Sequence, residues 1–229
     1  ERVKKFLKQN NEIDIKPNYV CEHKIDGLKI VLEYENGILK TAATRGDGEV
    51  GEDVTENIKT IESVPLRLTQ NINIIVEGEV WLPKSRLKFI NEKRKQNGEE
   101  LYANPRNLAA GTIRQLDPKI VRDRGLSTFI YDISKYDDMP KSQIEELELL
   151  KRLGFKVNKH YKFCKNIDEV IAYWNTWQNK MEKEDYLADG VVVKINKREY
   201  QEILGYTGKA PRWGIAFKFP AEQVTTILL

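Results

Sequence analysis

A lysine lies between two carboxylates in the segment Cys-Glu-His-Lys-Ile-Asp-Gly, residues 21–27. Side chains at every second position of an extended chain share a face, so we expect Glu22, Lys24 and Asp26 to project together. Gly27 would let a ligand approach the backbone closely. This arrangement offers an amine nucleophile its positioning, its hydrogen-bond partners and a route for its proton. The motif is short, so its interpretation depends on the other polar segments.

A glycine-rich segment follows the next predicted hairpin. Arg45 ends a predicted strand, and glycines follow at positions 46, 48 and 51, which indicates unusual backbone angles or close approach. Arg45 could bind a ribose or a phosphate. The spacing matches neither the phosphate-binding loop that ends in Gly-Lys-Ser/Thr nor the dinucleotide-binding G-x-G-x-x-G. Both of those nucleotide-binding folds are therefore disfavoured.

Charged residues also interrupt three apolar strands. Glu77 and Glu79 share one face of a strand predicted at 72–82, and burying carboxylates among apolar neighbours is costly unless they are paired or bind a ligand. Lys194 and Lys218 lie in the segments Asp-Gly-Val-Val-Val-Lys-Ile and Gly-Ile-Ala-Phe-Lys-Phe, where the pattern predicts burial. A buried lysine needs an anionic partner, so the two together indicate an anion site.

The pair Asn104 and Pro105 predicts the start of a helix, as cap and first position. Arg106 would lie in the first turn, where the helix dipole favours anions. Arg114, eight residues on, would lie on roughly the same face. Such a pair suits a phosphate, and two solvated arginines remain the alternative from this segment alone.

Composition narrows the class of protein. With 229 residues, of which 40% are hydrophobic, the chain can bury a core as one large domain or two small ones. A net charge of +3 does not by itself indicate a nucleic-acid binder. Cys21 and Cys164 suit a reducing cytosol, and with His23 and His160 they make no zinc-ligand spacing. No apolar run is long enough to span a membrane.

The periodicity of apolar residues predicts an α+β fold of antiparallel sheets with flanking helices and a cleft between the sheets. Residues 134–140 and 181–188 are expected to be loops. Helices are expected at 1–9, 84–97, 104–115, 141–153 and 167–180, and strands within 19–44 and at 72–82, 126–133, 189–195 and 214–219.

Taken in order, these motifs resemble the adenylation domain, or nucleotidyltransferase core, of bacterial NAD-dependent DNA ligases. The Lys-x-Asp-Gly, Asp-Gly-Val-Val-x-Lys and Phe-Lys-Phe pieces resemble the wider superfamily, which includes ATP-dependent ligases and capping enzymes. Two runs resemble the NAD-dependent branch more specifically. They are Thr-Arg-Gly-Asp-Gly-x-x-Gly-Glu-Asp and Ala-Asn-Pro-Arg-Asn-x-Ala-Ala-Gly-x-x-Arg-Gln-Leu-Asp. One departure is Glu77, where members of the family often carry arginine.

The resemblance implies that Lys24 attacks the α-phosphate of the nucleotide, carries AMP covalently and passes it to the 5′-phosphate of nicked DNA. Glu22 and Lys194 would read the adenine edge, and Tyr131 would stack on the base, although a tyrosine on an apolar strand is more often simple core. The implied catalytic residues are Lys24 and Asp26. The implied cofactor-binding residues are Glu22, Arg45, Glu79, Tyr131, Val192, Lys194 and Lys218, of which Arg45 and Glu79 would hold the ribose. The residues implied for phosphate or DNA are Arg106, Arg114 and Asp189.

The resemblance also implies the cofactors and partners. NAD is the adenylyl donor, Mg²⁺ is the expected helper without confident protein ligands, and zinc belongs to a module that this chain lacks. The partners are nicked double-stranded DNA and further domains of the same protein: an N-terminal nicotinamide-binding domain and C-terminal DNA-binding modules. Because the sequence begins with Glu1, we interpret it as an excised piece, with a linker helix at 1–10 and the nucleotidyltransferase domain at 11–229. We expect a cytoplasmic protein that does not enter membranes.

Two other functions stay open. One is an ATP-dependent nucleotidyltransferase of the RNA-ligase or capping type, which the choice of nucleotide donor would distinguish. The other is a noncatalytic nucleic-acid-binding module, which a labelling test on Lys24 would distinguish.

Overall fold

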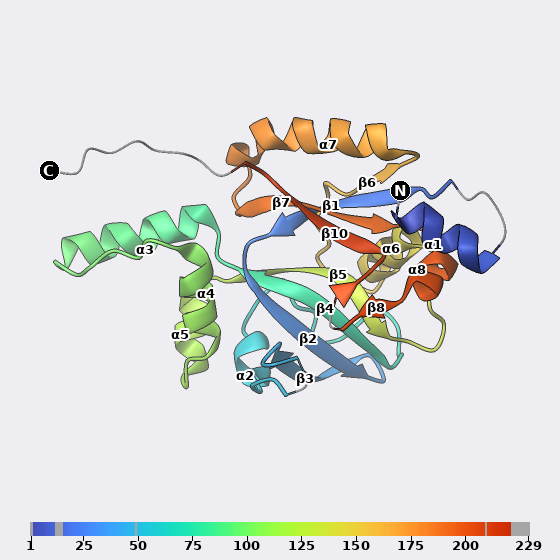
Figure 1. Cartoon of the computed structure of the whole chain (residues 1–229). Helices are drawn as coiled ribbons and strands as arrows, with labels where there is room; N and C mark the ends of the chain where they lie inside the picture. The colour runs from blue at the N-terminus through green and yellow to red at the C-terminus, as the bar shows by residue number, and fades with distance from the viewer. Residues whose placement is uncertain (1, 12–15, 49, 209, 221–229) are drawn as a thin grey trace, which may run out of the picture.

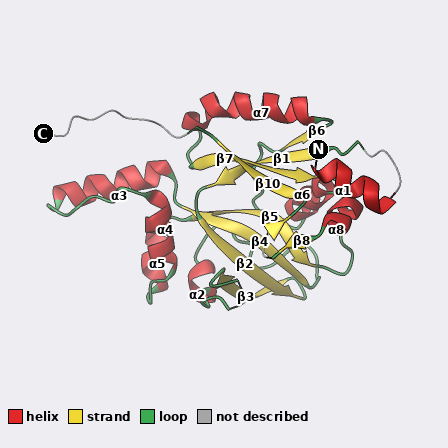
Figure 2. Ribbon diagram, viewed as in Figure 1, coloured by secondary structure: helices red, strands yellow, loops and turns green. Residues whose placement is uncertain are grey.

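Two four-stranded antiparallel sheets form the centre of the molecule, and helices flank them (Figures 1 and 2). The computed structural model describes residues 2–11, 16–48, 50–208 and 210–220. One sheet has the strand order β10-β7-β1-β6 and the other β3-β2-β4-β5. The predicted α+β fold of antiparallel sheets is therefore confirmed.

The strands are β1 (Tyr19–Ile25), β2 (Leu28–Glu35), β3 (Ile38–Thr44), β4 (Ile74–Trp81), β5 (Ser127–Lys135), β6 (Lys162–Cys164), β7 (Ala188–Ile195), β8 (Tyr206–Thr207), β9 (Ala210–Pro211) and β10 (Gly214–Lys218). The helices are α1 (Arg2–Asn11), α2 (Thr55–Ile58), α3 (Lys84–Gln96), α4 (Pro105–Ile113), α5 (Pro118–Arg124), α6 (Gln143–Arg152), α7 (Ile167–Lys180) and α8 (Arg198–Leu204), with a 3₁₀ turn at Met181–Lys183.

Strand β1 leaves the first sheet and β2 enters the second after only two residues, Asp26 and Gly27. This crossing holds the two sheets close at the Lys-x-Asp-Gly motif. A Cβ on Gly27 would lie 2.2 Å from the carbonyl oxygen of Val80 in β4. The glycine therefore admits a neighbouring strand, whereas the sequence suggested a ligand.

The second sheet covers the larger core. Its inward side chains, such as Ile30, Leu32 and Val76, are fully buried and pack with Leu147 and Leu150 of α6. Asn36 and Gly37 join β2 to β3 with φ values of 50° and 75°, as a tight hairpin turn requires. The packed core holds strands β4 and β5 in place, and these strands carry acidic and aromatic side chains of the candidate site.

Helices cover the outer faces. Helix α7 lies over the first sheet, while α3, α4 and α5 stand together at the left of the view in Figure 1. Helix α1 packs against α8 through Leu7 and Leu204. In the described ranges, no helix is long and apolar enough to cross a membrane.

The long elements lie within a few residues of their predicted positions. The sequence pattern missed the short ones, α2, α5, α8 and β6, which have between three and seven residues. Asn104 caps α4 as predicted, because its side-chain oxygen accepts hydrogen bonds from the backbone N–H groups of Arg106 and Asn107. Glu1 of the predicted first helix lies outside the described residues.

Candidate functional site

The amine of Lys24 pairs with a carboxylate from another strand. Its Nζ donates to Oδ1 of Asp189 in β7 at 2.7 Å. The neighbouring acids have other partners: Glu22 binds Lys194, and Asp26 binds Arg106 at 2.9 Å. The expected contact of Glu22 and Asp26 with Lys24 is therefore wrong in this structure, whereas the catalytic role of Asp26 stays a prediction. The irregular register between β1 and β7 at Lys24 turns these side chains toward different elements.

Asp189 also binds Lys218, so one carboxylate joins two lysines. Nζ of Lys218 lies 3.0 Å from Oδ2 of Asp189, because β10 pairs with β7 and sets Lys218 opposite Gly190. Burial opposes ionisation of Asp189, but the hydrogen bonds from Lys24 and Lys218 bring its pKa below the ordinary value. Two cations thus converge on one anion at the end of β7.

The predicted burial of Lys218 is wrong. Its side chain is 66% exposed, and β10 is an edge strand whose apolar residues Ile215 and Phe217 are exposed as well. An edge strand lacks a neighbour on one side, so an apolar pattern does not guarantee burial.

Lys194, by contrast, is buried as predicted, with 8% of its side chain exposed. Its Nζ lies 3.1 Å from Oε1 of Glu22 and 3.7 Å from Asp132, and it donates to the backbone oxygen of Tyr131 at 3.0 Å. Burial would lower the pKa of Lys194, but Glu22, Asp132 and Glu146 raise it above its ordinary value. The buried cation is therefore satisfied by acids from three elements.

Glu79 of β4 faces the same region with a perturbed carboxyl group. Burial raises the pKa of Glu79 to about 7, against opposing contributions from the Tyr131 hydroxyl and from Arg106, Lys24 and Lys29. The Tyr131 hydroxyl donates to Oε2 of Glu79 at 3.3 Å. Tyr131 thus meets an acid at its hydroxyl end and Lys194 near its ring, where Nζ lies 5.4 Å from the ring centroid.

Two adjoining pockets lie near these side chains, and only the first is lined by strands of both sheets. One, of about 590 Å³, is lined by Tyr131, Val192 and Lys194 among others. The other, of about 460 Å³, includes Arg45. They share three lining residues: Lys29, Glu77 and Tyr206. Glu77, the acid at a position where arginine was expected from the resemblance, forms an ion pair with Lys29. Its negative charge is therefore balanced by a neighbouring side chain.

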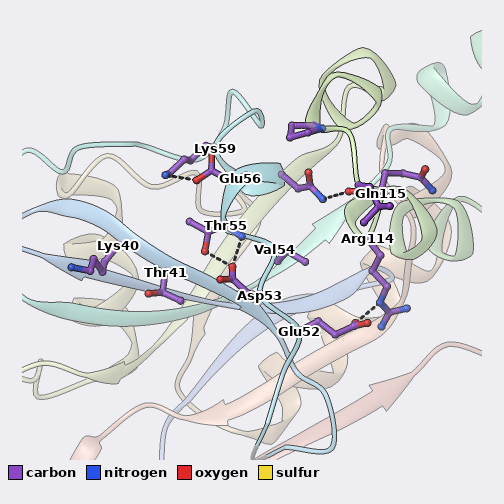
Figure 3. Close-up of a pocket in the computed structure, with 13 residues that line it drawn as sticks. Lys40, Thr41, Glu52, Asp53, Val54, Thr55, Glu56, Lys59, Arg114 and Gln115 are labelled. Atoms are coloured by element: carbon purple, nitrogen blue, oxygen red, sulfur yellow. Dashed lines mark hydrogen bonds and ion pairs between the residues drawn. The ribbon is translucent and has the colours of Figure 1, made fainter.

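Arg106 in the first turn of α4 and Arg114, which caps the C-terminal end of that helix, bind different acids. Arg106 reaches Asp26, next to the Lys24 motif, whereas Nε of Arg114 donates to Oε2 of Glu52 at 2.5 Å. Figure 3 shows this second pair at the rim of a separate pocket of about 600 Å³, beside α2 and the loop after α4. Both guanidinium groups are about half exposed, so a phosphate could reach either one.

Sequence reasoning missed several residues of the site. Asp132 lies beside Lys194, and the buried Gln143 and Glu146 of α6 bind the backbone of β5. A signal was available, because Gln143 and Glu146 occupy the same helical stripe as Leu147 and Leu150. A polar residue on the apolar stripe of an amphipathic helix calls for a buried partner.

No metal centre is evident in the part of the chain that the structure describes. There, no group of three or more His, Cys, Asp or Glu side chains is placed to hold a metal ion. Cys21 and Cys164, distant in sequence, lie on adjacent strands with sulfur atoms 3.8 Å apart, and both are buried free thiols.

Comparisons with known proteins agree with the motifs. The family model described as "NAD-dependent DNA ligase adenylation domain" matches residues 1–222. A DNA ligase of Thermotoga neapolitana is 52% identical over 100% of this chain, which covers 32% of that relative. A DNA ligase of Bacillus cereus is 49% identical over 94% of this chain and 32% of its own length. The chain thus spans about a third of the length of these curated relatives.

Among solved structures, a mycobacterial DNA ligase D complexed with ATP and MES is similar with a TM-score of 0.45 and 13% identity. The likeness covers 88% of this chain and 54% of that one.

Proposed function

Because the chain belongs to the NAD-dependent DNA ligase adenylation domain family, we propose that it transfers the adenylyl group of NAD to Lys24. The covalent AMP would then pass to the 5′-phosphate of a nick in double-stranded DNA. Since the chain spans about a third of its curated relatives, the complete ligation reaction belongs to a longer protein. Within this chain, we assign residues 11–229 to the nucleotidyltransferase domain and residues 1–10 to a linker helix.

The observation that carries this proposal is the convergence of Lys24 and Lys218 on Asp189. The carboxylate holds the attacking amine beside a second cation. A phosphate that enters between the two lysines would meet a nucleophile on one side and charge stabilisation on the other. Positioning and electrostatic stabilisation are the main sources of rate in phosphoryl transfer.

The chemical step is a displacement at phosphorus. Lys24 first gives its ammonium proton to solvent, its amine attacks the α-phosphorus, a nitrogen–phosphorus bond forms, and the bond to the oxygen of nicotinamide mononucleotide breaks. A second proton then leaves the nitrogen for solvent or for Asp189, the carboxylate 2.7 Å away. Lys218 would bind the α-phosphate, and its exposed ammonium can move to follow the charge.

The adenosine half of the cofactor would occupy the pocket of about 590 Å³. Tyr131 would stack on the base, as aromatic side chains do with nucleobases. Glu22 and Lys194 would read the adenine edge, Val192 would line the base, and Glu79 would bind the ribose. Arg45 lies in the adjoining pocket, from which it could reach the ribose.

Magnesium does not fit a site made by the protein alone, because the described residues gather no set of metal ligands. Mg²⁺ commonly keeps several waters and binds substrate phosphates with one or two carboxylates. We therefore expect Mg²⁺ to arrive bound to the phosphates of the cofactor. Zinc stays a prediction for a separate module. A cytoplasmic location stays a prediction as well.

Arg106 and Arg114 would contact phosphates of the nicked duplex. Phosphate contacts position a protein on DNA and carry no sequence information directly. Each arginine now binds an acid, Asp26 or Glu52, so a phosphate would compete with a partner already present. Ion pairs this exposed are weak, and such an exchange is feasible.

The decisive experiment is mass spectrometry of the chain fused to a nicotinamide-binding domain, after incubation with NAD or ATP and magnesium. We expect an AMP adduct on Lys24 from NAD, lost in Lys24→Ala and kept in the control Lys40→Ala, whose lysine is exposed. The chain alone should react slowly or not at all, because in-line attack needs the leaving group held. Fusion to a nicotinamide-binding domain should restore the step.

The same measurement separates the alternatives. An adduct mapped to Lys194 or Lys218 would contradict the assignment of Lys24. Rapid adduct formation from ATP would instead favour an ATP-dependent nucleotidyltransferase. The absence of any adduct in the fused protein would favour a noncatalytic nucleic-acid-binding module.

A further inference from the structure

Strand β5 carries an irregularity at the residue proposed to stack on the base. In its pairing with β4, Asp132 lies opposite Glu77 but Ile130 lies opposite Gly78, so Tyr131 is an extra residue without a partner in the register. An extra residue of this kind is a β-bulge, which re-aims a side chain and disturbs the ladder of hydrogen bonds. The direction of the Tyr131 ring therefore depends on what stabilises the bulge.

Side chains from other elements satisfy the backbone around this bulge. The carbonyl oxygen of Tyr131 accepts from Nζ of Lys194 at 3.0 Å and from Nε2 of Gln143 at 3.3 Å. Two residues on, the N–H of Ile133 donates to Oε1 of Glu146 at 2.7 Å. An unpaired buried backbone group is costly, so these three side chains stabilise the irregular backbone.

Gln143 and Glu146 are themselves almost fully inaccessible, with 1% and 0% exposure. Apolar residues at these positions would extend the core that Leu147 and Leu150 already form on the same helix. Burying an amide and a carboxylate there is unfavourable unless their hydrogen bonds serve a purpose. Neither residue lines the pocket of about 590 Å³, so neither is placed to touch its occupant.

The same end of α6 is also fastened to the chain that follows β7. The N–H of Gln143 donates to the carbonyl oxygen of Asn196 at 2.8 Å, and the N–H of Ile144 donates to its side-chain oxygen at 3.2 Å. Arg198 forms an ion pair with the second oxygen of Glu146. Helix α6 therefore ties the strand of Tyr131 to the strand of Lys194, across the two sheets.

We propose that Gln143 and Glu146 are positioning residues for adenine recognition. They hold the Tyr131 bulge and fix it relative to Lys194, so that the aromatic ring and the ammonium group face the base together. This inference rests on the proposed function, because it assumes that Tyr131 is the base platform. It adds two residues that act through Tyr131 and Lys194 without touching the nucleotide.

The test is a double-mutant cycle on AMP affinity, measured by titration calorimetry with the whole chain. Gln143→Met is nearly isosteric and removes the amide that binds the bulge. We expect it to raise the Kd for AMP about three- to tenfold when Tyr131 is present, the effect of losing about one hydrogen bond. In the Tyr131→Ala background the same change should alter the Kd less than about twofold, because the two residues act as a unit.

A matched control separates positioning from general stability. Leu150 is fully buried in the same helix, and it does not bind the bulge. Leu150→Val should lower the midpoint of thermal unfolding and leave the Kd for AMP unchanged. Glu146→Gln provides a second positioning variant if Gln143→Met does not fold, and it should show the same dependence on Tyr131.

Equal losses of affinity in both backgrounds would overturn the proposal, as would an unchanged Kd in folded Gln143→Met. The cycle also distinguishes failure of the inference from failure of the proposed function. If the wild-type chain binds AMP and Tyr131→Ala weakens it, the proposed nucleotide site stands whatever Gln143 does. If the wild type does not bind AMP, or Tyr131→Ala binds equally well, the base platform is wrong and this inference is wrong with it.

Discussion

Replacing Glu79 with glutamine should stabilise the protein in mildly alkaline solution and have little effect in acid. Burial raises the pKa of this carboxyl from its ordinary 4.5 to about 7. The folded state therefore holds the Glu79 proton more tightly than the unfolded chain does. The resulting stability is fully present below about pH 4.5 and is lost as the pH rises through about 7.

The size of the effect follows from the same shift in the pKa of Glu79. A pKa that moves from 4.5 to about 7 corresponds to about 3 kcal/mol of folding free energy between the two pH extremes. Water that reaches the half-buried carboxyl reduces this figure, so we expect about 2 kcal/mol. Glutamine can still accept the hydrogen bond from Tyr131 and carries no charge. The variant therefore does not lose folding free energy as the pH rises.

The assay is denaturant unfolding of the wild type and Glu79→Gln at about pH 5 and about pH 8. The variant should gain about 2 kcal/mol relative to the wild type on going from the lower to the higher pH. Glu77→Gln is the matched control from the same strand, and it should destabilise at about pH 8 because Lys29 loses its ion-pair partner. A Glu79→Gln stability that follows the wild type at both pH values would refute the reasoning.

Three further outcomes test other parts of the site. Lys194→Met should destabilise the fold by about 3–5 kcal/mol in denaturant unfolding, because Glu22 is left as an uncompensated buried charge; a change below about 1 kcal/mol would contradict this. Arg106→Ala and Arg114→Ala should each weaken binding of nicked duplex and flatten its salt dependence by about one unit of slope, and unchanged slopes in both would reject DNA contacts. Asp189→Asn should slow formation of the AMP adduct at least about tenfold in the chain fused to a nicotinamide-binding domain, as followed by intact mass, and a wild-type rate would show that the carboxylate does not position Lys24.

Some of the site could be predicted from local pattern. The spacing within residues 189–195 predicted a buried lysine in an apolar strand, and Lys194 is buried. Asn104 caps its helix because the cap requires only residues adjacent in sequence. The order of motifs indicated the family, and the family model confirms it. These features depend on the identity of near neighbours, which a sequence displays directly.

The tertiary structure decided which groups meet. Lys24 binds Asp189, 165 positions away, because β1 and β7 pair in a particular register, and register between distant strands is not written in either strand alone. The apolar pattern around Lys218 gave the wrong burial because the pattern does not reveal that β10 is an edge strand.

The Tyr131 bulge shows the same division most clearly. The sequence predicted the strand, and a resemblance supplied a role for the tyrosine. Only the folded chain reveals that this residue is unpaired in the ladder and that Gln143 and Glu146 bind the backbone around it. Local sequence thus determined where the long helices and strands form and that Lys194 is buried. Long-range pairing of strands and helices decided the partners of each charge, because hydrogen bonds and ion pairs depend on distances that exist only after folding.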